Sequence, residues 1–306
     1  MNPDQLSAFP TTHQGLENWA RVHGTSLLEA QRRFAQYAVC LGVASSEFLR
    51  SVLVLKGGNA LYFAYGRARS TVDLDFSARK TKPIADLDRF KTELDRILPP
   101  IASRLGVRLR VQKWKRNPPN LFMETPTCQF AIAYAFPGQK WFERWDHVKR
   151  PVPTVVNMEI AINEEVCEAN KPFRQPEIQA LEVCSVEDIF AEKLRALLQQ
   201  VQRNRSRPQD VYDLTALLGG SRQPDAGKVA AFLKRKCEAR QLVPSMAAFE
   251  DARVWERAAR DYGALSRTVH EDLIEFGEAK TRIIEYVKRL DLPATGPLVT
   301  ERGSSE

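Results

Sequence analysis

The sequence predicts an α+β fold, with strands in the middle of the chain and helices on both sides of them. A helical pattern covers residues 16–49, and the segments with strand patterns lie between residues 52 and 183. Only helical patterns follow, and the 306 residues are enough to bury one large core or two small ones. The expected domains are an N-terminal helical segment (1–50), a mixed-sheet core (51–183), a C-terminal helical domain (184–292) and a disordered tail (293–306).

The first helices are predicted from apolar side chains that recur at spacings of three and four residues. Leu27, Phe34 and Leu41 belong to this pattern, and Thr25 is placed to cap the helix that contains them. Nothing in this region points to chemistry, so its expected role is to pack against the core.

An apolar run at residues 52–55 predicts a strand that ends in a glycine turn. Gly57 and Gly58 leave backbone N–H groups open beside the start of a helix, and such a place suits a phosphate group. The side-chain amide of Asn59 can also donate to a phosphate oxygen. The turn is therefore a candidate phosphate cradle, and the alternative is an ordinary strand-to-helix turn.

A second strand follows that helix and carries two acids. Alternation places Asp73 and Asp75 on one face, opposite the apolar face formed by Val72, Leu74 and Phe76. Carboxylates this close repel each other unless a cation or a proton lies between them. Mg²⁺ prefers one or two carboxylates together with substrate phosphates, so the pair is a candidate site for Mg²⁺ (or Mn²⁺). The alternative is a solvated strand face, although acids are depleted in strands.

The rest of the core is predicted as one helix and several strands. The expected elements are a helix at 85–98 ended by Pro99 and Pro100, a strand at 107–111, a basic loop at 113–119, strands at 130–136 and 154–163, and a short strand before 183. Glu159 stands out because it lies in the middle of a strand that is otherwise apolar on one face.

The C-terminal part is predicted to be helical throughout. The expected helices cover residues 185–201, 210–218, 229–237, 246–259 and 273–290. Ser185 and Asp188 have the spacing of a capping box at the start of the first of these helices. Gly219 and Gly220 are expected to end the second.

The composition is that of a globular protein with a basic balance, with a formal net charge of +7 and a pI near 9.2. This balance permits a nucleic-acid partner without requiring one. Two basic clusters are open to phosphate binding or to simple solvation: Arg108, Arg110, Lys113, Lys115 and Arg116, and then Arg203, Arg205 and Arg207.

The predicted localisation rests on the lack of a membrane-spanning run and of a secretory signal. No apolar run reaches the roughly 20 residues that span a bilayer, and the N-terminal residues show no secretory signal. We therefore expect a cytoplasmic protein with no membrane partner. The five cysteines are scattered along the chain, which predicts free thiols.

Two motifs give the chain a family resemblance. The first is Lys56-Gly57-Gly58-Asn59-Ala60-Leu61, followed by Arg69-Ser70-Thr71-Val72-Asp73-Leu74-Asp75-Phe76. The second is Glu192-Lys193-Leu194-Arg195-Ala196-Leu197, followed by Arg207-Pro208-Gln209-Asp210-Val211-Tyr212-Asp213-Leu214. In this order and spacing they resemble the AbiEii toxin family of the polymerase-β-like nucleotidyltransferases, over about residues 45–220.

The resemblance implies a polymerase-β-like nucleotidyltransferase core. It implies that Asp73 and Asp75 are metal ligands and catalytic acids, and that Glu159 supplies a third carboxylate. The residues that it implies for nucleotide binding are Lys56, Gly57, Gly58, Asn59, Arg69 and Thr71. Arg69 is equally suited to contact phosphate or to hold its loop by pairing with an acid.

The second motif implies two further catalytic residues. Lys193 would meet the nucleotide phosphates, and the alternative is a lysine that snorkels at the edge of the core. Asp210 would make a catalytic or structural contact to the region of Lys193. An acid near a helix N-terminus is also favoured without any function.

The resemblance implies a magnesium-dependent nucleotidyltransferase that moves a nucleotide from an NTP to RNA, with the tRNA 3′ end as the expected acceptor. It also implies a toxin of a type IV toxin–antitoxin system with a cognate antitoxin encoded nearby. Two alternatives are transfer to a protein hydroxyl and a catalytically silent module that binds nucleotide or RNA. The sequence does not distinguish which NTP is used.

Overall fold

The structure is a computed structural model that describes residues 12–66, 71–81, 86–117, 126–147, 150–173, 175–220, 223–269 and 273–296. Its strands are β1 (Leu53–Lys56), β2 (Asp73–Arg79), β3 (Arg108–Asn117), β4 (Thr127–Ala135), β5 (Val155–Glu164), β6 (Ala169–Asn170) and β7 (Val183–Cys184). Its helices are α1 (Leu16–Val22), α2 (Leu27–Ser45), α3 (Glu47–Val52), α4 (Gly57–Tyr65), α5 (Asp88–Leu105), α6 (Lys140–Glu143), α7 (Val186–Arg203), α8 (Pro208–Leu218), α9 (Ala226–Glu238), α10 (Met246–Glu250), α11 (Ala252–Ala259) and α12 (Phe276–Val287).

The chain forms two compact units. The first comprises the described residues of Met1–Gly66, Thr71–Glu164 and Asn170–Val183, and the second those of Glu165–Ala169 and Cys184–Glu306. The strands β1 to β5 and the N-terminal helices belong to the first unit, and the helices from α7 onwards belong to the second.

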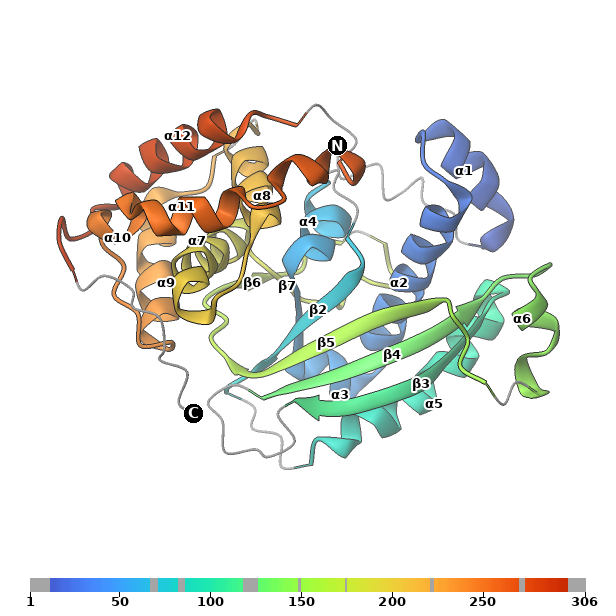
Figure 1. The fold of residues 1–306 in the computed structure, drawn as a ribbon. Helices are drawn as coiled ribbons and strands as arrows, with labels where there is room; N and C mark the ends of the chain where they lie inside the picture. Colours follow the sequence, from blue (N-terminus) through green and yellow to red (C-terminus); the bar gives the residue numbers. More distant parts are fainter. Residues whose placement is uncertain are drawn as a thin grey trace, which may run out of the picture. The chain divides into compact units, whose positions relative to one another are not determined.

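Within the described residues the strands form one mixed sheet in the order β3-β4-β5-β2-β1-β7-β6 (Figure 1). The pair β2–β5 is parallel, whereas β1–β2, β4–β5 and β3–β4 are antiparallel. The predicted α+β class is therefore confirmed. The strands β2 and β5, which are far apart in the sequence, lie next to each other in the sheet.

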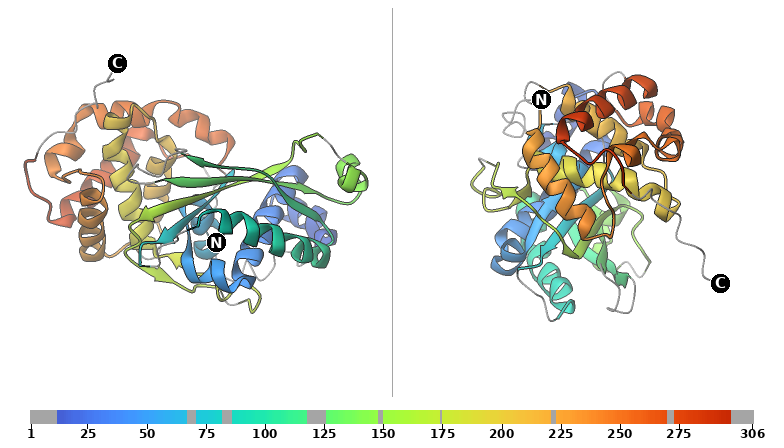
Figure 2. Two further views of the ribbon diagram at one scale, coloured as in Figure 1. Left: turned by 90° about the horizontal axis from the view of Figure 1, so that it is seen from below. Right: turned by 90° about the vertical axis from the view of Figure 1, so that its left-hand side faces the viewer.

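Helices cover one face of this sheet. Figures 1 and 2 show α3 and α5 on the same side of the strands, and α2 packs against α5. The apolar faces of the strands supply the core below these helices, with buried Leu74, Phe76, Phe130, Ile132, Met158 and Ile160. The alternate residues of the same strands lie on the opposite face, where the polar side chains are found.

Three local predictions about the first strands and helices are wrong. Val52 closes α3 rather than opening β1, and Val72 is 49 % exposed and precedes β2. The cap of α2 is Ser26 rather than Thr25, since the Ser26 hydroxyl accepts a 3.1 Å hydrogen bond from the Glu29 N–H. Leu74 and Phe76 lie on the buried face as predicted.

Helix α5 does not end at Pro99 and Pro100, as predicted, but continues to Leu105. A proline inside a helix leaves the carbonyl four residues earlier without its donor. Both prolines are exposed, as are the residues four positions before them, so water can reach these carbonyls. Ile101 and Leu105 continue the buried stripe of the helix, and their packing outweighs the missing hydrogen bonds.

The predicted basic loop at 113–119 is also wrong, because β3 extends through Asn117. Lys113 to Asn117 pair with β4, and the Trp114 ring stacks on Phe130 with centroids 6.0 Å apart. The alternation of the strand separates the basic residues. Arg116 pairs with Asp88 at 2.5 Å on the helix side, whereas Lys113 and Lys115 are exposed on the other side.

The second unit consists of helices packed around α7. Its start is capped as predicted, since the Ser185 hydroxyl accepts from the Asp188 N–H at 3.1 Å. The helix expected at 246–259 is interrupted at Asp251, whose carboxylate caps α11. The start of the predicted disordered tail is ordered: the carbonyl of Pro293 accepts from the Met246 N–H at 2.9 Å. Residues 297–306 lie outside the described residues.

The cysteines are free thiols, as predicted. Burial raises the pKa of Cys128 to about 11 and that of Cys237 to about 12, so these thiols stay protonated at neutral pH. None of the helices in the described part of the chain is long and apolar enough to cross a membrane.

Candidate active site

The glycine turn brings the start of α4 directly against the carboxylate of Asp75. Gly57 has a φ of 71°, in the left-handed region that glycine adopts without strain. A Cβ atom at this position would lie 2.6 Å from Oδ2 of Asp75. Only a glycine therefore allows the turn and the acid to approach each other this closely.

The register of the sheet then aligns the polar residues in a row. Asp75 on β2 lies beside Lys56 on β1 and Glu159 on β5. Glu159 lies beside Gln129 on β4, and Gln129 lies beside Lys115 on β3. Register partners point to the same face, with neighbouring strands about 4.8 Å apart. We call these five residues the Asp75 row.

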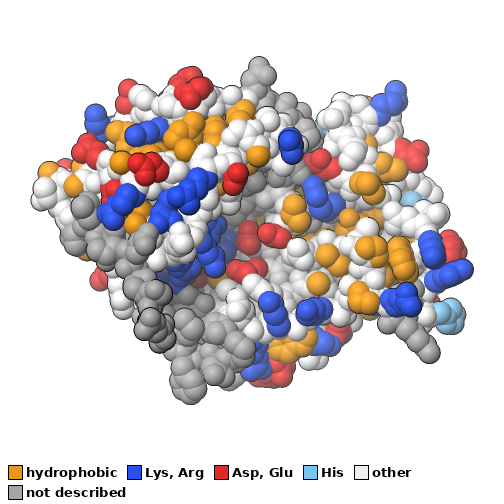
Figure 3. Space-filling model, viewed as in Figure 1, with side chains coloured by type: hydrophobic (Ala, Val, Ile, Leu, Met, Phe, Trp, Pro, Cys, Tyr) orange, Lys and Arg blue, Asp and Glu red, His pale blue; other side chains and the backbone are white. Residues whose placement is uncertain are grey.

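A shorter row runs beside it, with Asp73 next to Asn157, and Asn157 next to Ala131. The Asn157 amide donates to Oδ1 of Asp73 at 3.3 Å. The Gln129 amide donates to Oε2 of Glu159 at 2.6 Å. Figure 3 shows acidic side chains gathered near the centre of this face, over the region of β2 and β5. Neutral amides thus orient two of the carboxylates without removing their charge.

These acids fit a two-carboxylate site for Mg²⁺. Asp73 and Asp75 share one strand face, and their oxygen atoms are the donors that this ion prefers. Among the described residues, no group of three or more His, Cys, Asp or Glu side chains is arranged to hold a metal ion. The remaining ligand positions would fall to substrate phosphates and water, which is the usual arrangement for Mg²⁺.

Lys56 is held by a polar cluster on the same face. Its ammonium forms an ion pair with Glu164, whose carboxylate also accepts a 2.7 Å hydrogen bond from the Ser77 hydroxyl. Glu164 and Ser77 are both buried. The pair holds the Lys56 ammonium at Glu164, while the backbone of Lys56 lies beside Asp75 in the row.

Asn59, the predicted phosphate donor, is buried at the start of α4. Its side chain is 2 % exposed, and its amide donates to the backbone carbonyl of Asp73 at 2.6 Å. In this structure the amide therefore joins the helix start to β2 and is not presented to a ligand. Gln36, which is 0 % exposed, similarly donates to the carbonyls of Thr71 and Val72 at 2.9 Å.

All of the predicted nucleotide-binding roles remain predictions, including those of Arg69 and Thr71. Arg69 lies outside the described residues. Thr71 is half-buried, and the hydrogen bond to Gln36 uses its backbone carbonyl.

Lys193 and Asp210 belong to the second unit and form an ion cluster there. The Lys193 ammonium lies 2.8 Å from Oδ1 of Asp210 and 2.7 Å from Oδ2 of Asp213. All three side chains are buried. The predicted contact between Asp210 and the region of Lys193 is present, and the role of Lys193 at the nucleotide phosphates stays a prediction.

Several residues of the site were missed from the sequence. Gln129, Glu164 and Gln36 each hold a site residue or the backbone next to one. Gln36 carried a signal, since it is an uncharged polar residue within the long apolar stretch of α2. Gln129 and Glu164 carried none, because only the sheet register brings them to the site.

We expect Gly57→Ala to lower nucleotide transfer at least tenfold. Alanine adds a backbone strain of about 1–2 kcal/mol at positive φ, and its Cβ displaces the Asp75 carboxylate. Gly138→Ala is the matched control, because Gly138 has a φ of 80° and its Cβ would meet nothing within 4 Å. Initial rates of both variants test this, and an equal loss in the control would show that strain alone is responsible.

We expect Asn59→Ala to lower the free energy of unfolding by about 1 kcal/mol and to reduce kcat, since one hydrogen bond to the start of β2 is lost. The KM for the NTP should change little. Urea titration and steady-state rates measure both effects, with the exposed Asn170→Ala as control. A raised KM with unchanged stability would instead favour the phosphate contact that the sequence predicts.

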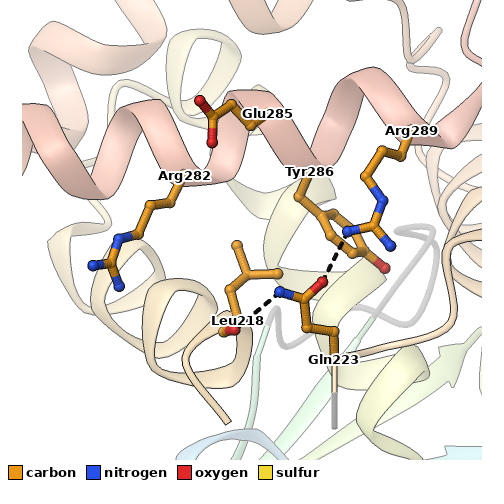
Figure 4. Close-up of a pocket in the computed structure, with 6 residues that line it drawn as sticks. All are labelled: Leu218, Gln223, Arg282, Glu285, Tyr286 and Arg289. Carbon is orange, nitrogen blue, oxygen red and sulfur yellow. Dashed lines mark hydrogen bonds between the residues drawn. The ribbon is translucent and has the colours of Figure 1, made fainter. Parts of the chain in front are cut away.

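A cavity of about 390 Å³ lies in the second unit, lined by Leu218, Gln223, Arg282, Glu285, Tyr286 and Arg289. Figure 4 shows Arg289 donating to Gln223, which donates in turn to the carbonyl of Leu218. None of the predicted site residues lines this cavity. Arg289 and Gln223 are thus bonded within the lining, whereas Arg282 pairs with Glu278 and the Tyr286 hydroxyl donates to the carbonyl of Pro224.

A glycine turn followed by paired acids on the next strand of a mixed sheet is the arrangement expected of a nucleotidyltransferase. The family described as nucleotidyl transferase AbiEii toxin of type IV toxin–antitoxin systems matches residues 41–282, and the chain belongs to this AbiEii family. Membership in a toxin–antitoxin family implies a cognate antitoxin. None of the curated protein sequences matches the chain.

Two of the solved structures that resemble the chain come from Helicobacter pylori. JHP933 from Helicobacter pylori aligns with a TM-score of 0.50 and 16 % identity, over 87 % of this chain and 92 % of that one. A candidate nucleotidyltransferase from H. pylori aligns with a TM-score of 0.44 and 17 % identity, over 83 % of this chain and 90 % of that one. At this identity the likeness to JHP933 supports the fold alone.

Proposed function

We propose that this protein transfers a nucleoside monophosphate from an NTP to the 3′ end of an RNA, with tRNA as the expected acceptor and Mg²⁺ as the metal. The observation that carries this proposal is the contact of the Gly57 turn with Asp75, which lies in register with Glu159. The glycine turn, Asp73 and Asp75, and the carboxylate of Glu159 are thereby close together, which supports the proposal.

Each residue of this face has a separate role in the proposed reaction. Asp73 and Asp75 hold the metal, which when bound neutralises phosphate charge and orients the reacting groups. The N–H groups of the Gly57 turn bind the triphosphate, and Lys56 contributes positive charge to the same face. The RNA 3′-hydroxyl attacks the α-phosphorus, Glu159 accepts its proton, and pyrophosphate leaves.

An RNA acceptor is favoured by the charge around the site. Lys113 and Lys115 are exposed on the strand at the edge of the sheet, and Lys115 belongs to the Asp75 row. Lysines in this position can contact phosphates of a strand whose end lies at the acids. The net charge of +7 supports the same partner. Since NTPs and tRNA are cytoplasmic substrates, we place the reaction in the cytoplasm.

The test is to incubate the purified protein with each of the four labelled NTPs, total tRNA and a cell lysate, with Mg²⁺, with Mn²⁺ and with EDTA. We expect label in tRNA from one or a few NTPs and none with EDTA. Sequencing of the tRNA 3′ ends then gives the nucleotide and the number added. Label that enters only protein would contradict the RNA proposal and support transfer to a protein hydroxyl, and binding without transfer would indicate a silent module.

A further inference from the structure

A group of arginines surrounds the turn between α7 and α8 in the second unit. Helix α7 ends at Arg203, Asn204 follows in the left-handed conformation with a φ of 46°, and α8 begins at Pro208. Arg203 and Arg205 are exposed, and Arg207 is half-buried. Together with Arg240, which follows α9, we call them the arginine patch. Figure 3 shows Lys and Arg side chains gathered on this unit near α7.

The turn that carries the patch is held by a set of hydrogen bonds. The Arg207 N–H donates to the side-chain oxygen of Gln200 at 2.7 Å, and the Arg205 N–H donates to the Gln200 carbonyl at 3.1 Å. The Ser206 hydroxyl donates to the carbonyl of Arg257 at 2.9 Å. The backbone of the turn is therefore fixed before any ligand binds, and the ordering of the loop costs little on binding.

The positive charges of the patch lie close to one another. Partial burial of the guanidinium and then the neighbouring arginines Arg240, Arg195, Arg205 and Arg207 lower the pKa of Arg203. Among the residues that the structure describes, Arg203, Arg205 and Arg207 form no ion pair with a carboxylate.

Other cationic side chains of this unit do form ion pairs with carboxylates. Lys228 pairs with Glu168 at 2.7 Å, and Arg282 pairs with Glu278 at 2.5 Å. Like charges held together in a fixed turn repel each other, and a bound polyanion relieves this repulsion. A guanidinium can also grip a phosphate with two parallel hydrogen bonds.

We propose that the arginine patch binds the phosphodiester backbone of the acceptor RNA. This inference rests on the proposed RNA acceptor and names a surface of the second unit that holds it. Contacts to the phosphate backbone carry no sequence information, so the patch should contribute affinity to any sequence, and this affinity should be sensitive to salt.

The test is binding of the full-length protein to a labelled RNA of about 20 nucleotides, to a DNA of the same sequence and to deacylated tRNA, by fluorescence anisotropy between about 50 and 300 mM KCl. The variant Arg203→Gln/Arg205→Gln/Arg207→Gln should raise the Kd for RNA at least about tenfold at the lowest salt. The slope of log Kd against log salt should fall by about 2, as expected for three lost contacts to a single strand. An equal loss for DNA supports a contact to the backbone, and a loss for RNA alone ties the contact to the sugar as well.

The control removes the same charge elsewhere on this unit, with Arg282→Gln, Lys288→Gln and Arg289→Gln on the exposed side of α12 and the turn after it. It should change the Kd less than twofold. The conservative variant Arg203→Lys/Arg205→Lys/Arg207→Lys should keep most of the affinity, and all variants should keep the wild-type melting temperature and NTP affinity. An equal rise in the Kd of the control would show that only net charge matters, and it would overturn the proposal that the arginine patch binds RNA.

Different experimental results would overturn the inference and the proposed function. The inference is overturned if the triple glutamine variant binds RNA as well as the wild-type protein does, which is also the result expected if the patch binds an acidic protein instead. It is overturned as well if the wild-type protein does not bind RNA. RNA binding that depends on the patch but is followed by no transfer of label to RNA overturns the proposed function and leaves the inference standing.

Discussion

Replacing Asp75 by alanine is expected to reduce nucleotide transfer about a thousandfold while the protein remains folded. The substitution removes one of the two acids that would hold the metal, and the charge stabilisation lost is worth several kcal/mol, with about 1.4 kcal/mol for each factor of ten. Asp75 is half-buried on the polar face of the sheet, so its loss leaves no cavity in the apolar core.

The measurement is the rate of label transfer from the preferred NTP to tRNA under single-turnover conditions. Asp95→Ala is the control, because Asp95 is an exposed acid on α5 that pairs at the surface with Lys91. It should transfer at the wild-type rate. A transfer rate of the Asp75 variant within a few-fold of the wild-type rate, with unchanged metal dependence, would contradict the assignment of this face as the active site.

Replacing Lys193 by methionine is expected to lower the free energy of unfolding by about 3–5 kcal/mol, because two buried carboxylates lose the cation that they share. Methionine keeps most of the volume of the side chain, so the effect reports the charge and not a cavity. Urea denaturation measures the loss, and the surface lysine variant Lys234→Met provides the baseline.

A compensated variant separates the structural role of Lys193 from a catalytic one. Asp210→Asn and Asp213→Asn remove the buried negative charges, so the triple variant with Lys193→Met should recover most of the lost stability. If transfer remains absent in this stable variant, the cluster has the catalytic role that the second motif implies. If transfer returns in full, the cluster has only a structural role. If Lys193→Met alone does not lower the free energy of unfolding, the buried ion pairs do not stabilise the fold by the expected amount of about 3–5 kcal/mol.

Local sequence patterns were sufficient for most of the elements that carry the site. The glycine turn, the alternation around Leu74 and the capping serine at 185 all gave correct predictions, since each depends on neighbours within a few residues. The predictions failed where packing outweighs local preference. Pro99 and Pro100 continue a helix because its buried stripe extends past them, and Trp114 lies in a strand because β4 pairs with it.

In the candidate site, too, some features could be predicted from local sequence and others could not. The pair Asp73 and Asp75 could be recognised from spacing alone, because residues two apart on a strand share a face. The partner of Asn59 could not, since a side-chain amide bonds equally well to a ligand or to a backbone carbonyl brought near by folding. Glu164 as the partner of Lys56 depends on a strand more than a hundred residues away.

The sequence by itself determined the chemistry available to this protein: a glycine turn able to accept phosphate, two neighbouring acids and a lysine-bearing helix, because these are properties of residue type and short spacing. Only the tertiary structure decided which groups meet. Pairing of β2 with β5 set Glu159 beside Asp75, and burial directed Asn59 and Gln36 to backbone carbonyls. The physical reason is that register and burial are collective properties of the packed sheet, and no short stretch of chain contains them.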